Sequence, residues 1–104
     1  MMTDQSQNPQ PYWYIKVPQD RFPKAKFDFA QQVAVSYDNG TGELCTDIGE
    51  VIGIKYISCG NKSGEWYYLL RILKCDFEPS FVGSIDQEFA NESSLVADNT
   101  VIEQ

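Results

Sequence analysis

Two apolar runs joined by a short polar break constrain the fold of this chain more than any other feature. The first run is GEVIGIKYIS (49–58), the second is EWYYLLRILK (65–74), and CGNKSG (59–64) lies between them. Each run is rich in β-branched and aromatic residues and the break contains glycine, so the pattern predicts a long β-hairpin. The pattern leaves open whether so much aromatic and aliphatic surface fills a core or also contacts a partner.

The position of the turn decides which side chains of this hairpin share a face, because side chains alternate along a strand. A turn centred near Lys62 gives a core face of four opposed pairs: Ile52 with Ile72, Ile54 with Leu70, Tyr56 with Tyr68, and Ser58 with Trp66. The opposite side then carries apolar residues and two cations: Val51, Lys55, Ile57, Tyr67, Leu69, Arg71 and Leu73. A one-residue slip would exchange the faces, whereas a bulge at Gly53 would put Val51 and Ile54 on the same side.

Two segments before the hairpin also have strand-like sequences. QVAVSY (32–37) alternates, with Val33, Val35 and Tyr37 on one side. The turn signal DNGTG (38–42) follows at once, which favours a strand over a helix through Phe29 and Val33. YWYIKV (12–17) is followed by prolines at positions 18 and 23, so we expect an edge strand or an arm laid over the rest of the fold.

The C-terminal third predicts little regular structure. Residues 76–84 are expected to form a loop, and FANESSLVA (89–97) predicts a single 3₁₀ turn between Phe89 and Leu95. A short last strand is expected at residues 100–102. The length of 104 residues predicts one domain over residues 12–102, after a flexible polar N-terminal arm at residues 1–11.

Charge and residue inventory argue against several classes of function. The net charge of −7 at pH 7 disfavours nucleic-acid and anionic-membrane partners. Histidine is absent, which excludes His-ligated metal sites and Ser-His or Cys-His nucleophile pairs. The three cysteines form no CxxC motif. We therefore expect neither an enzyme nor a bound cofactor or metal. The odd cysteine number and the lack of an apolar signal region predict a cytoplasmic protein.

Three pieces of sequence, taken in order, resemble the SH3-like barrels. QQVAVSYD (31–38) is similar to the first strand of that fold, and GEVIGI (49–54) and EWYYLLRIL (65–73) to the second and third. IDQEFANESSLVAD (85–98) is similar to the closing segment, where a 3₁₀ turn precedes the last strand. The resemblance implies an all-β fold, a small SH3-like barrel of about five strands. An extra N-terminal strand or arm and one short 3₁₀ turn would complete it.

The same order of elements occurs in small accessory barrels of photosynthetic electron transport. Examples are one of the small accessory proteins of photosystem I and the variable chain of ferredoxin–thioredoxin reductase. The order also occurs in many bacterial binding modules. Because such short motifs indicate fold and not function, the resemblance assigns no functional residue to this chain.

Six residues on one side of the hairpin, here called the mixed face, are the first candidate for a binding site: Lys55, Ile57, Tyr67, Leu69, Arg71 and Leu73. If exposed, they would form an apolar patch edged by cations, and such patches mark interfaces. Residues 12–17 are an alternative cover for this face. The remaining alternatives are a second copy of the chain and a foreign protein.

Three further groups are weaker candidates. An aromatic set beside the acidic loop 38–48 would suit a basic or proline-rich peptide unless it is simply core: Tyr12, Trp13, Tyr14, Phe22 and Tyr37. Cys45 and Cys75 would lie near one open end, with Gly49 opposite Cys75, as a redox pair or as inert thiols, and Cys59 would lie at the opposite tip. Five carboxylates would offer acid–base chemistry unless they are solvated loop residues: Glu43, Asp47, Glu50, Asp76 and Glu78.

The sequence therefore predicts a non-catalytic protein-interaction module that binds a protein partner, or itself as a homodimer, through the mixed face. The alternative is an accessory subunit of a redox or photosynthetic electron-transport complex. Its acidic surface would be steered toward a basic docking surface.

Overall fold

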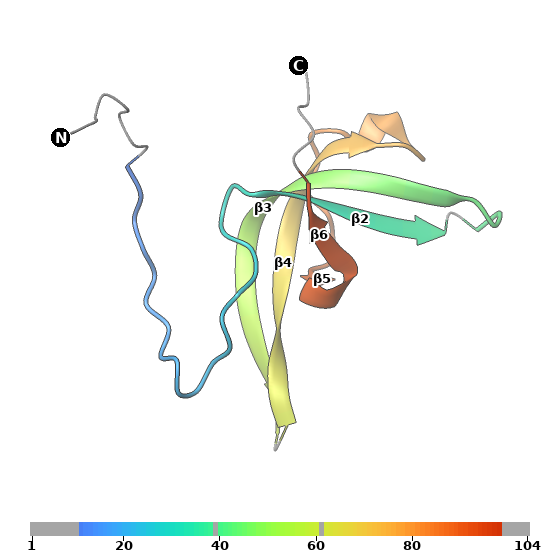
Figure 1. The fold of residues 1–104 in the computed structure, drawn as a ribbon. Helices are drawn as coiled ribbons and strands as arrows, with labels where there is room; N and C mark the ends of the chain where they lie inside the picture. Colours follow the sequence, from blue (N-terminus) through green and yellow to red (C-terminus); the bar gives the residue numbers. More distant parts are fainter. Residues whose placement is uncertain (1–10, 39, 61, 99–104) are drawn as a thin grey trace.

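A computed structural model describes residues 11–38, 40–60 and 62–98 of the protein. Within those residues the protein is all-β, as predicted, with one five-stranded antiparallel sheet and two 3₁₀ helices (Figure 1). The strands are β2 (Gln32–Asp38), β3 (Leu44–Cys59), β4 (Lys62–Cys75), β5 (Ala90–Asn91) and β6 (Leu95–Ala97). Their order across the sheet is β5-β4-β3-β2-β6.

The hairpin of β3 and β4 is confirmed, but its register differs from the expected one by two residues. Ile54 lies opposite Tyr68 and Tyr56 opposite Trp66, because Cys59 pairs directly with Lys62 around a tighter turn. Gly60 adopts φ 66°, a left-handed conformation that glycine accommodates without strain. Because side chains alternate with a period of two, a slip of two residues leaves the two faces as predicted.

A bulge in β3 corrects one assignment. Val51 lies opposite Leu70 and Gly53 opposite Leu69, which leaves Ile52 as the extra residue. Val51 and Ile54 therefore share the core face, as the Gly53 bulge predicted, and Val51 is only 1% exposed. The pairing of Ile52 with Ile72 was wrong. A side chain at position 53 would approach Leu69 Cβ to 2.9 Å, so only glycine fits without rearrangement.

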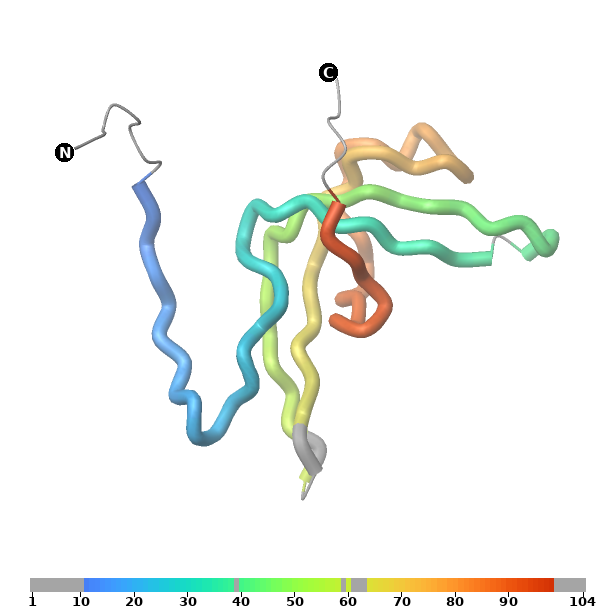
Figure 2. Tube along the Cα trace, viewed as in Figure 1, coloured from blue at the N-terminus to red at the C-terminus, as the bar shows by residue number. Residues whose placement is uncertain are grey.

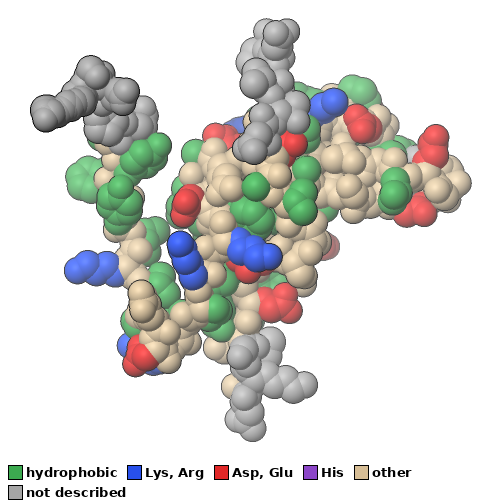
Figure 3. Space-filling view, viewed as in Figure 1, with side chains coloured by type: hydrophobic (Ala, Val, Ile, Leu, Met, Phe, Trp, Pro, Cys, Tyr) green, Lys and Arg blue, Asp and Glu red, His purple; other side chains and the backbone are tan. Residues whose placement is uncertain are grey.

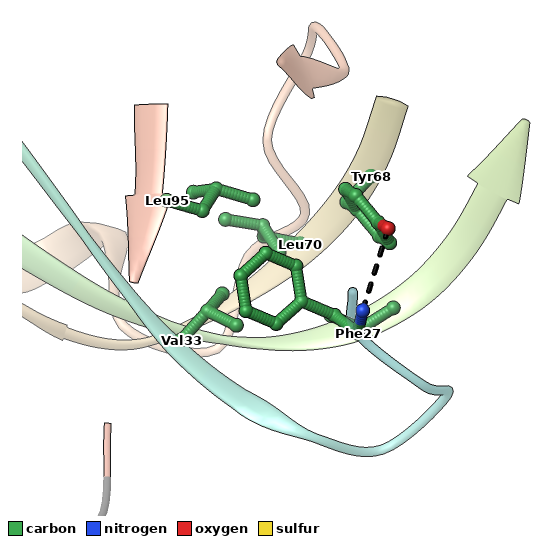
Figure 4. Packing of buried hydrophobic residues seen from close by; sticks show 6 residues of the cluster. Phe27, Val33, Tyr68, Leu70 and Leu95 are labelled. Carbon is green, nitrogen blue, oxygen red and sulfur yellow. Dashed lines mark hydrogen bonds between the residues drawn. The ribbon is translucent and has the colours of Figure 1, made fainter. Parts of the chain in front are cut away.

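The core lies on the concave side of the sheet, where the segment before β2 packs against β2, β3, β4 and β6 (Figure 4). Its buried members are Phe27, Val33, Val51, Tyr68, Leu70 and Leu95. Phe27 comes from the segment before β2, and its ring meets that of Tyr68 edge-on with centroids 5.2 Å apart. Val35, Ile54, Trp66 and Ala90 pack around this cluster.

Strand β2 confirms the predicted strand at 32–37 and ends in the predicted turn. Asp38 Oδ1 accepts hydrogen bonds from the backbone N–H groups of Gly40 at 2.7 Å and Gly42 at 3.3 Å. Both glycines have positive φ, 96° and 88°, which non-glycine residues rarely adopt. The helix through Phe29 and Val33 is therefore excluded. The strand that follows begins at Leu44, five residues earlier than the run at 49–58 indicated.

Residues 12–17 form neither an edge strand nor an arm laid over the rest of the fold, so both alternatives were wrong. They run apart from the sheet as an extended segment (Figures 1 and 2). Backbone N–H groups of Arg21 and Phe22 bond to Pro18 O in the turn that follows. The segment does not cover the mixed face. The flexible arm expected at residues 1–11 lies outside the described residues apart from Pro11, and the strand expected at 100–102 lies outside them altogether.

The chain after β4 returns along that strand and then crosses to β2. Hydrogen bonds from Gly83 N to Ile72 O and from Ile72 N to Ser84 O begin this return, and β5 completes it. The predicted 3₁₀ turn between Phe89 and Leu95 is confirmed as η2 (Glu92–Ser94), and β6 then pairs with β2. A second turn, η1 (Pro79–Phe81), lies in the segment expected to be a loop. Among the described residues no helix has the length and apolarity needed to cross a membrane.

Candidate functional site

The mixed face forms one side of the β3–β4 hairpin. Lys55 lies opposite Tyr67, Ile57 opposite Glu65, and Leu69 opposite Gly53, so these side chains leave the same side of the sheet. Arg71 follows Leu69 by two residues and lies opposite Glu50, with 3.9 Å between Arg71 Nε and Glu50 Oε1. Leu73 lies at a second register shift, beside the pairing of Gly49 with Ile72, and the alternation breaks there.

Phe89 joins this face although the sequence did not indicate it. Lys55 Nζ lies 4.0 Å from the centroid of the Phe89 ring and 5.9 Å from that of Tyr67, so the cation contacts two aromatic rings. Pairing of Asn91 with Tyr67 in β5 brings Phe89 to this position. The only available signal was the apolar residue just before the predicted 3₁₀ turn.

Exposed apolar side chains lie at both ends of the mixed face. Ile57 is 42% exposed near the hairpin tip, and Ile85, which bridges to Arg71, is 50% exposed beside β4. Tyr67 and Leu69 lie half-buried between them. Further apolar side chains are about half exposed around η1: Phe77, Phe81 and Val82. The hairpin therefore presents a band of apolar surface on the side away from the core.

The structure does not assemble the predicted aromatic set. Tyr12 and Tyr14 contact each other with ring centroids 6.5 Å apart, whereas Trp13 is 99% exposed. Tyr37 lies elsewhere, where its hydroxyl donates to Asp47 Oδ1 at 3.0 Å. Burial and this hydrogen bond both raise the pKa of Tyr37 above its ordinary value, so it stays protonated.

An aromatic row that the sequence did not reveal lies on the core side of the hairpin tip. The Tyr56 ring meets Phe22 at 5.1 Å and Trp66 at 5.0 Å, both edge-on. Trp66 Nε1–H donates to Pro23 O at 3.0 Å. The row therefore binds the chain's own proline-containing segment. The prolines in VPQDRFP and the cross-strand neighbours Tyr56 and Trp66 were visible in the sequence, but only the register places them together.

A shallow groove of about 230 Å³ lies beside this row, between Pro23, Trp66 and Glu92. Glu92 Oε2 accepts hydrogen bonds from the Tyr68 hydroxyl at 2.5 Å and from Lys26 N at 2.8 Å. Burial, and then the bond to Glu92, raise the pKa of Tyr68 above its ordinary value. This carboxylate is thus engaged in holding η2 against β4, which favours a structural role over an acid–base one.

Cys45 and Cys75 are buried near the same end of the sheet, as predicted, and no disulfide joins them. Cys75 lies opposite Asp47 and not Gly49, which corrects the pairing, while Tyr37 lies opposite Cys45. The two thiols are thus diagonal neighbours, whose side chains stand roughly 7–8 Å apart in a regular sheet. A disulfide needs about 3.5–4.5 Å between Cβ atoms, so bridging them would require the strands to move.

Two of the five candidate carboxylates are engaged in contacts within the sheet. Glu50 pairs with Arg71 and Asp47 accepts from Tyr37. Within residues 11–38, 40–60 and 62–98, no three Cys, Asp or Glu side chains gather in a way that could hold a metal ion. The mixed face is therefore the surface with the strongest chemical case for a role in binding.

Comparison with known proteins adds no relative, because no family model, no curated protein and no solved structure matches the chain.

Proposed function

We propose that this protein is a non-catalytic interaction module, an SH3-like barrel that binds a protein through the mixed face. The strand order and the position of η2 between β5 and β6 support the barrel, since the closing strand returns to β2 after a 3₁₀ turn. A cytoplasmic location is part of this proposal and rests on the cysteine content of the sequence.

One observation carries the proposal, namely the exposed apolar side chains at both ends of the mixed face. Ile57 and Ile85 are 42% and 50% exposed on either side of Tyr67 and Leu69. Exposed apolar surface that is contiguous and edged by charges is typical of interfaces, where aromatic and arginine side chains supply most of the binding energy. Tyr67 and Arg71 are residues of those two types.

The two cations of the face are already held in place. Phe89 and Tyr67 lie beneath Lys55, and Glu50 lies beside Arg71. Side chains ordered before binding lose less conformational entropy when a partner docks. A partner that buries Ile57 and Tyr67 would therefore meet a largely preformed surface.

Two variants and one control test the proposal. Tyr67→Asp places a charge in the centre of the face, and Ile57→Lys changes an exposed position opposite Glu65 where the fold tolerates a cation. Leu44→Asp, at a position 79% exposed at the far end of β3, is the matched control. We expect both face variants, but not the control, to lose the proteins that wild type retains in a pull-down read by mass spectrometry. Unchanged capture by both folded face variants would contradict the proposal.

A second candidate function follows from the charge distribution. Residues 31–98 carry eleven anions and four cations, a net charge of −7. Such a surface favours a partner with a basic docking surface, as expected for an accessory subunit of a redox or photosynthetic electron-transport complex. Binding to that partner should weaken as ionic strength rises, which surface plasmon resonance would measure. Binding that is insensitive to salt would count against this role.

A further inference from the structure

Residues 12–17, here called the aromatic segment, expose nearly all of their apolar surface. Exposed fractions are 67% for Tyr12, 99% for Trp13, 86% for Tyr14, 75% for Ile15 and 40% for Val17. Figure 3 shows hydrophobic side chains standing along this part of the chain, away from the sheet. The sequence is rich in the residue types that favour strands, which gain stability only when they pair and pack against neighbours. The segment therefore has a strand-like sequence but pairs with no strand of the described chain.

One part of strand β3 has an edge that pairs with no other strand of the described chain. On the side of β2, the ladder ends with the hydrogen bonds from Ala30 N to Val51 O and from Val51 N to Gln31 O. Ala30 has φ 70°, and the chain there turns inward so that Phe27 enters the core. Beyond Val51, residues 52–58 pair only with β4 among the described residues. Every second residue of this free edge directs its N–H and C=O away from β4.

The segment and the edge match in length, and the larger parts of the chain to which they belong differ in net charge. The segment has six residues and the free edge has seven, counting residues 12–17 and 52–58. Residues 11–30 carry four cations and two anions, a net charge of +2, whereas residues 31–98 carry a net charge of −7. The opposite net charges of residues 11–30 and residues 31–98 favour association between copies of this chain.

The fold keeps the segment from its own edge. Phe22 packs on Tyr56 and the Trp66 indole binds Pro23 O, so the chain is anchored on the core side of the hairpin a few residues after the segment ends. Figures 1 and 2 show the connection to β2 lying between the segment and β3. A partner for the segment is therefore expected from a second molecule.

We propose that the aromatic segment of one copy pairs as an added β-strand along the free edge, residues 52–58, of a second copy. Reciprocal exchange between two copies gives a closed two-fold dimer in which each edge receives one strand. Trp13, Ile15 and Val17 alternate, so they share one face of the added strand and extend the apolar surface of the sheet. This pairing uses the edge of β3 and not the mixed face, so it goes beyond the function proposed above.

The first test is the solution mass of the full chain across a concentration series, measured by analytical ultracentrifugation. Ile15→Pro removes a backbone N–H in the middle of the added strand, and Ile15→Val is the matched control that keeps it. Ile15 is 75% exposed and lies outside the sheet, so neither change disturbs the core. We expect a concentration-dependent dimer for wild type and Ile15→Val, and a dissociation constant raised about tenfold or more for Ile15→Pro.

The second test locates the pairing by amide hydrogen exchange. Residues 52–58 should exchange more slowly at high protein concentration than at low, and Ile15→Pro should remove this difference. A wild type that stays monomeric at its highest soluble concentration overturns the proposal. So does a dimer that Ile15→Pro leaves intact and Tyr67→Asp abolishes, because it would assemble through the mixed face. Edge protection that does not change with concentration would mean that the segment folds onto its own chain, which also overturns it.

Discussion

Two short segments of this protein have almost interchangeable sequences in terms of strand propensity, yet only one of them is a strand. QVAVSY (32–37) becomes β2, paired on both sides with β3 and β6. YWYIKV (12–17) is richer in aromatic residues and pairs with no described strand. The two segments differ in whether a neighbouring strand is available to pair with them. Propensity describes fitness for a pleated, half-buried surface, and such a surface exists only where a neighbouring edge supplies it.

The largest expected effect comes from a matched pair of substitutions, one in each segment. Val33 is fully buried in β2, so Val33→Asp would place an unpaired carboxylate in the core and cost about 4 kcal/mol or more. Ile15→Asp, at an exposed position, should change the free energy of unfolding by less than about 0.5 kcal/mol. Urea unfolding at low protein concentration measures both. A large loss for Ile15→Asp would show that the aromatic segment is part of the monomer's core.

The next effect tests the bulge in the pairing of β3 with β4. Gly53→Ala adds a Cβ that would lie 2.9 Å from Leu69 Cβ and 3.5 Å from the Phe89 ring. We expect the free energy of unfolding to fall by about 1–3 kcal/mol, the usual range for overpacking. Thermal unfolding followed by circular dichroism is the measurement. An unchanged midpoint would mean that the hairpin relaxes at this position without loss.

A smaller effect concerns the residue that ties the segment before β2 to the sheet. The Tyr68 hydroxyl donates to Glu92 and accepts from Phe27 N at 3.4 Å. Tyr68→Phe keeps the ring and its packing, so the loss should be about 1–2 kcal/mol, the cost of leaving buried polar groups unpaired. Chemical denaturation at neutral pH measures it, with the exposed Tyr14→Phe as the control. Equal stability of both variants would contradict the role assigned to this hydroxyl.

The same hydroxyl gives a pH dependence whose sign is determined by its environment. Burial and hydrogen bonding raise the pKa of Tyr68, and also that of Tyr37, above the ordinary value of 10.0. The folded state therefore holds these protons more tightly than the unfolded state. The resulting stabilisation is complete below pH 10 and is lost as the pH rises above it. Unfolding measured from pH 8 upward should show a decline above about pH 10 that is less steep in Tyr68→Phe.

The smallest expected effect is that of Trp13→Ala on the monomer. Its side chain is 99% exposed, so removing it should change the free energy of unfolding by less than about 0.5 kcal/mol. Its effect on self-association should be larger, because the proposed added strand buries this ring. The ratio of the two effects, from urea unfolding and sedimentation, sharpens the contrast between β2 and the aromatic segment. If Trp13→Ala lowers the free energy of unfolding but leaves self-association unchanged, the aromatic segment stabilises the monomer and not the dimer.

Local sequence patterns were sufficient to predict the all-β class, the hairpin, the strand at 32–37, the turn at Asp38 and the 3₁₀ turn before Leu95. Each depends on interactions within a few residues or on the period of two that any strand obeys. That period also explains why the faces of residues 54–57 in β3 and 66–71 in β4 were predicted correctly despite a wrong register. A slip of two residues exchanges partners, whereas a slip of one would have exchanged the faces.

Other features depend on residues far apart in the chain. Phe89 reaches Lys55 only because β5 pairs with β4, and Pro23 meets Trp66 only because the chain before β2 crosses the hairpin. Tyr37 likewise does not join the predicted aromatic set, because the pairing of β2 with β3 brings its hydroxyl to Asp47. Each of these contacts joins residues that are far apart in the chain. A local sequence pattern does not indicate which of several distant residues will be the partner.

The net charge of this protein follows from its composition alone, and the alternation of its side chains follows from the order of its amino acids, because alternation depends only on near neighbours. Whether a strand-like segment becomes a strand follows from the tertiary structure, because its backbone hydrogen bonds need an edge from elsewhere. Residues 32–38 received two such edges, and residues 12–17 received none within the described chain. Residues 12–17 therefore leave apolar side chains and backbone hydrogen-bonding groups in water. Pairing with a second copy of the chain would bury these groups and lower the free energy.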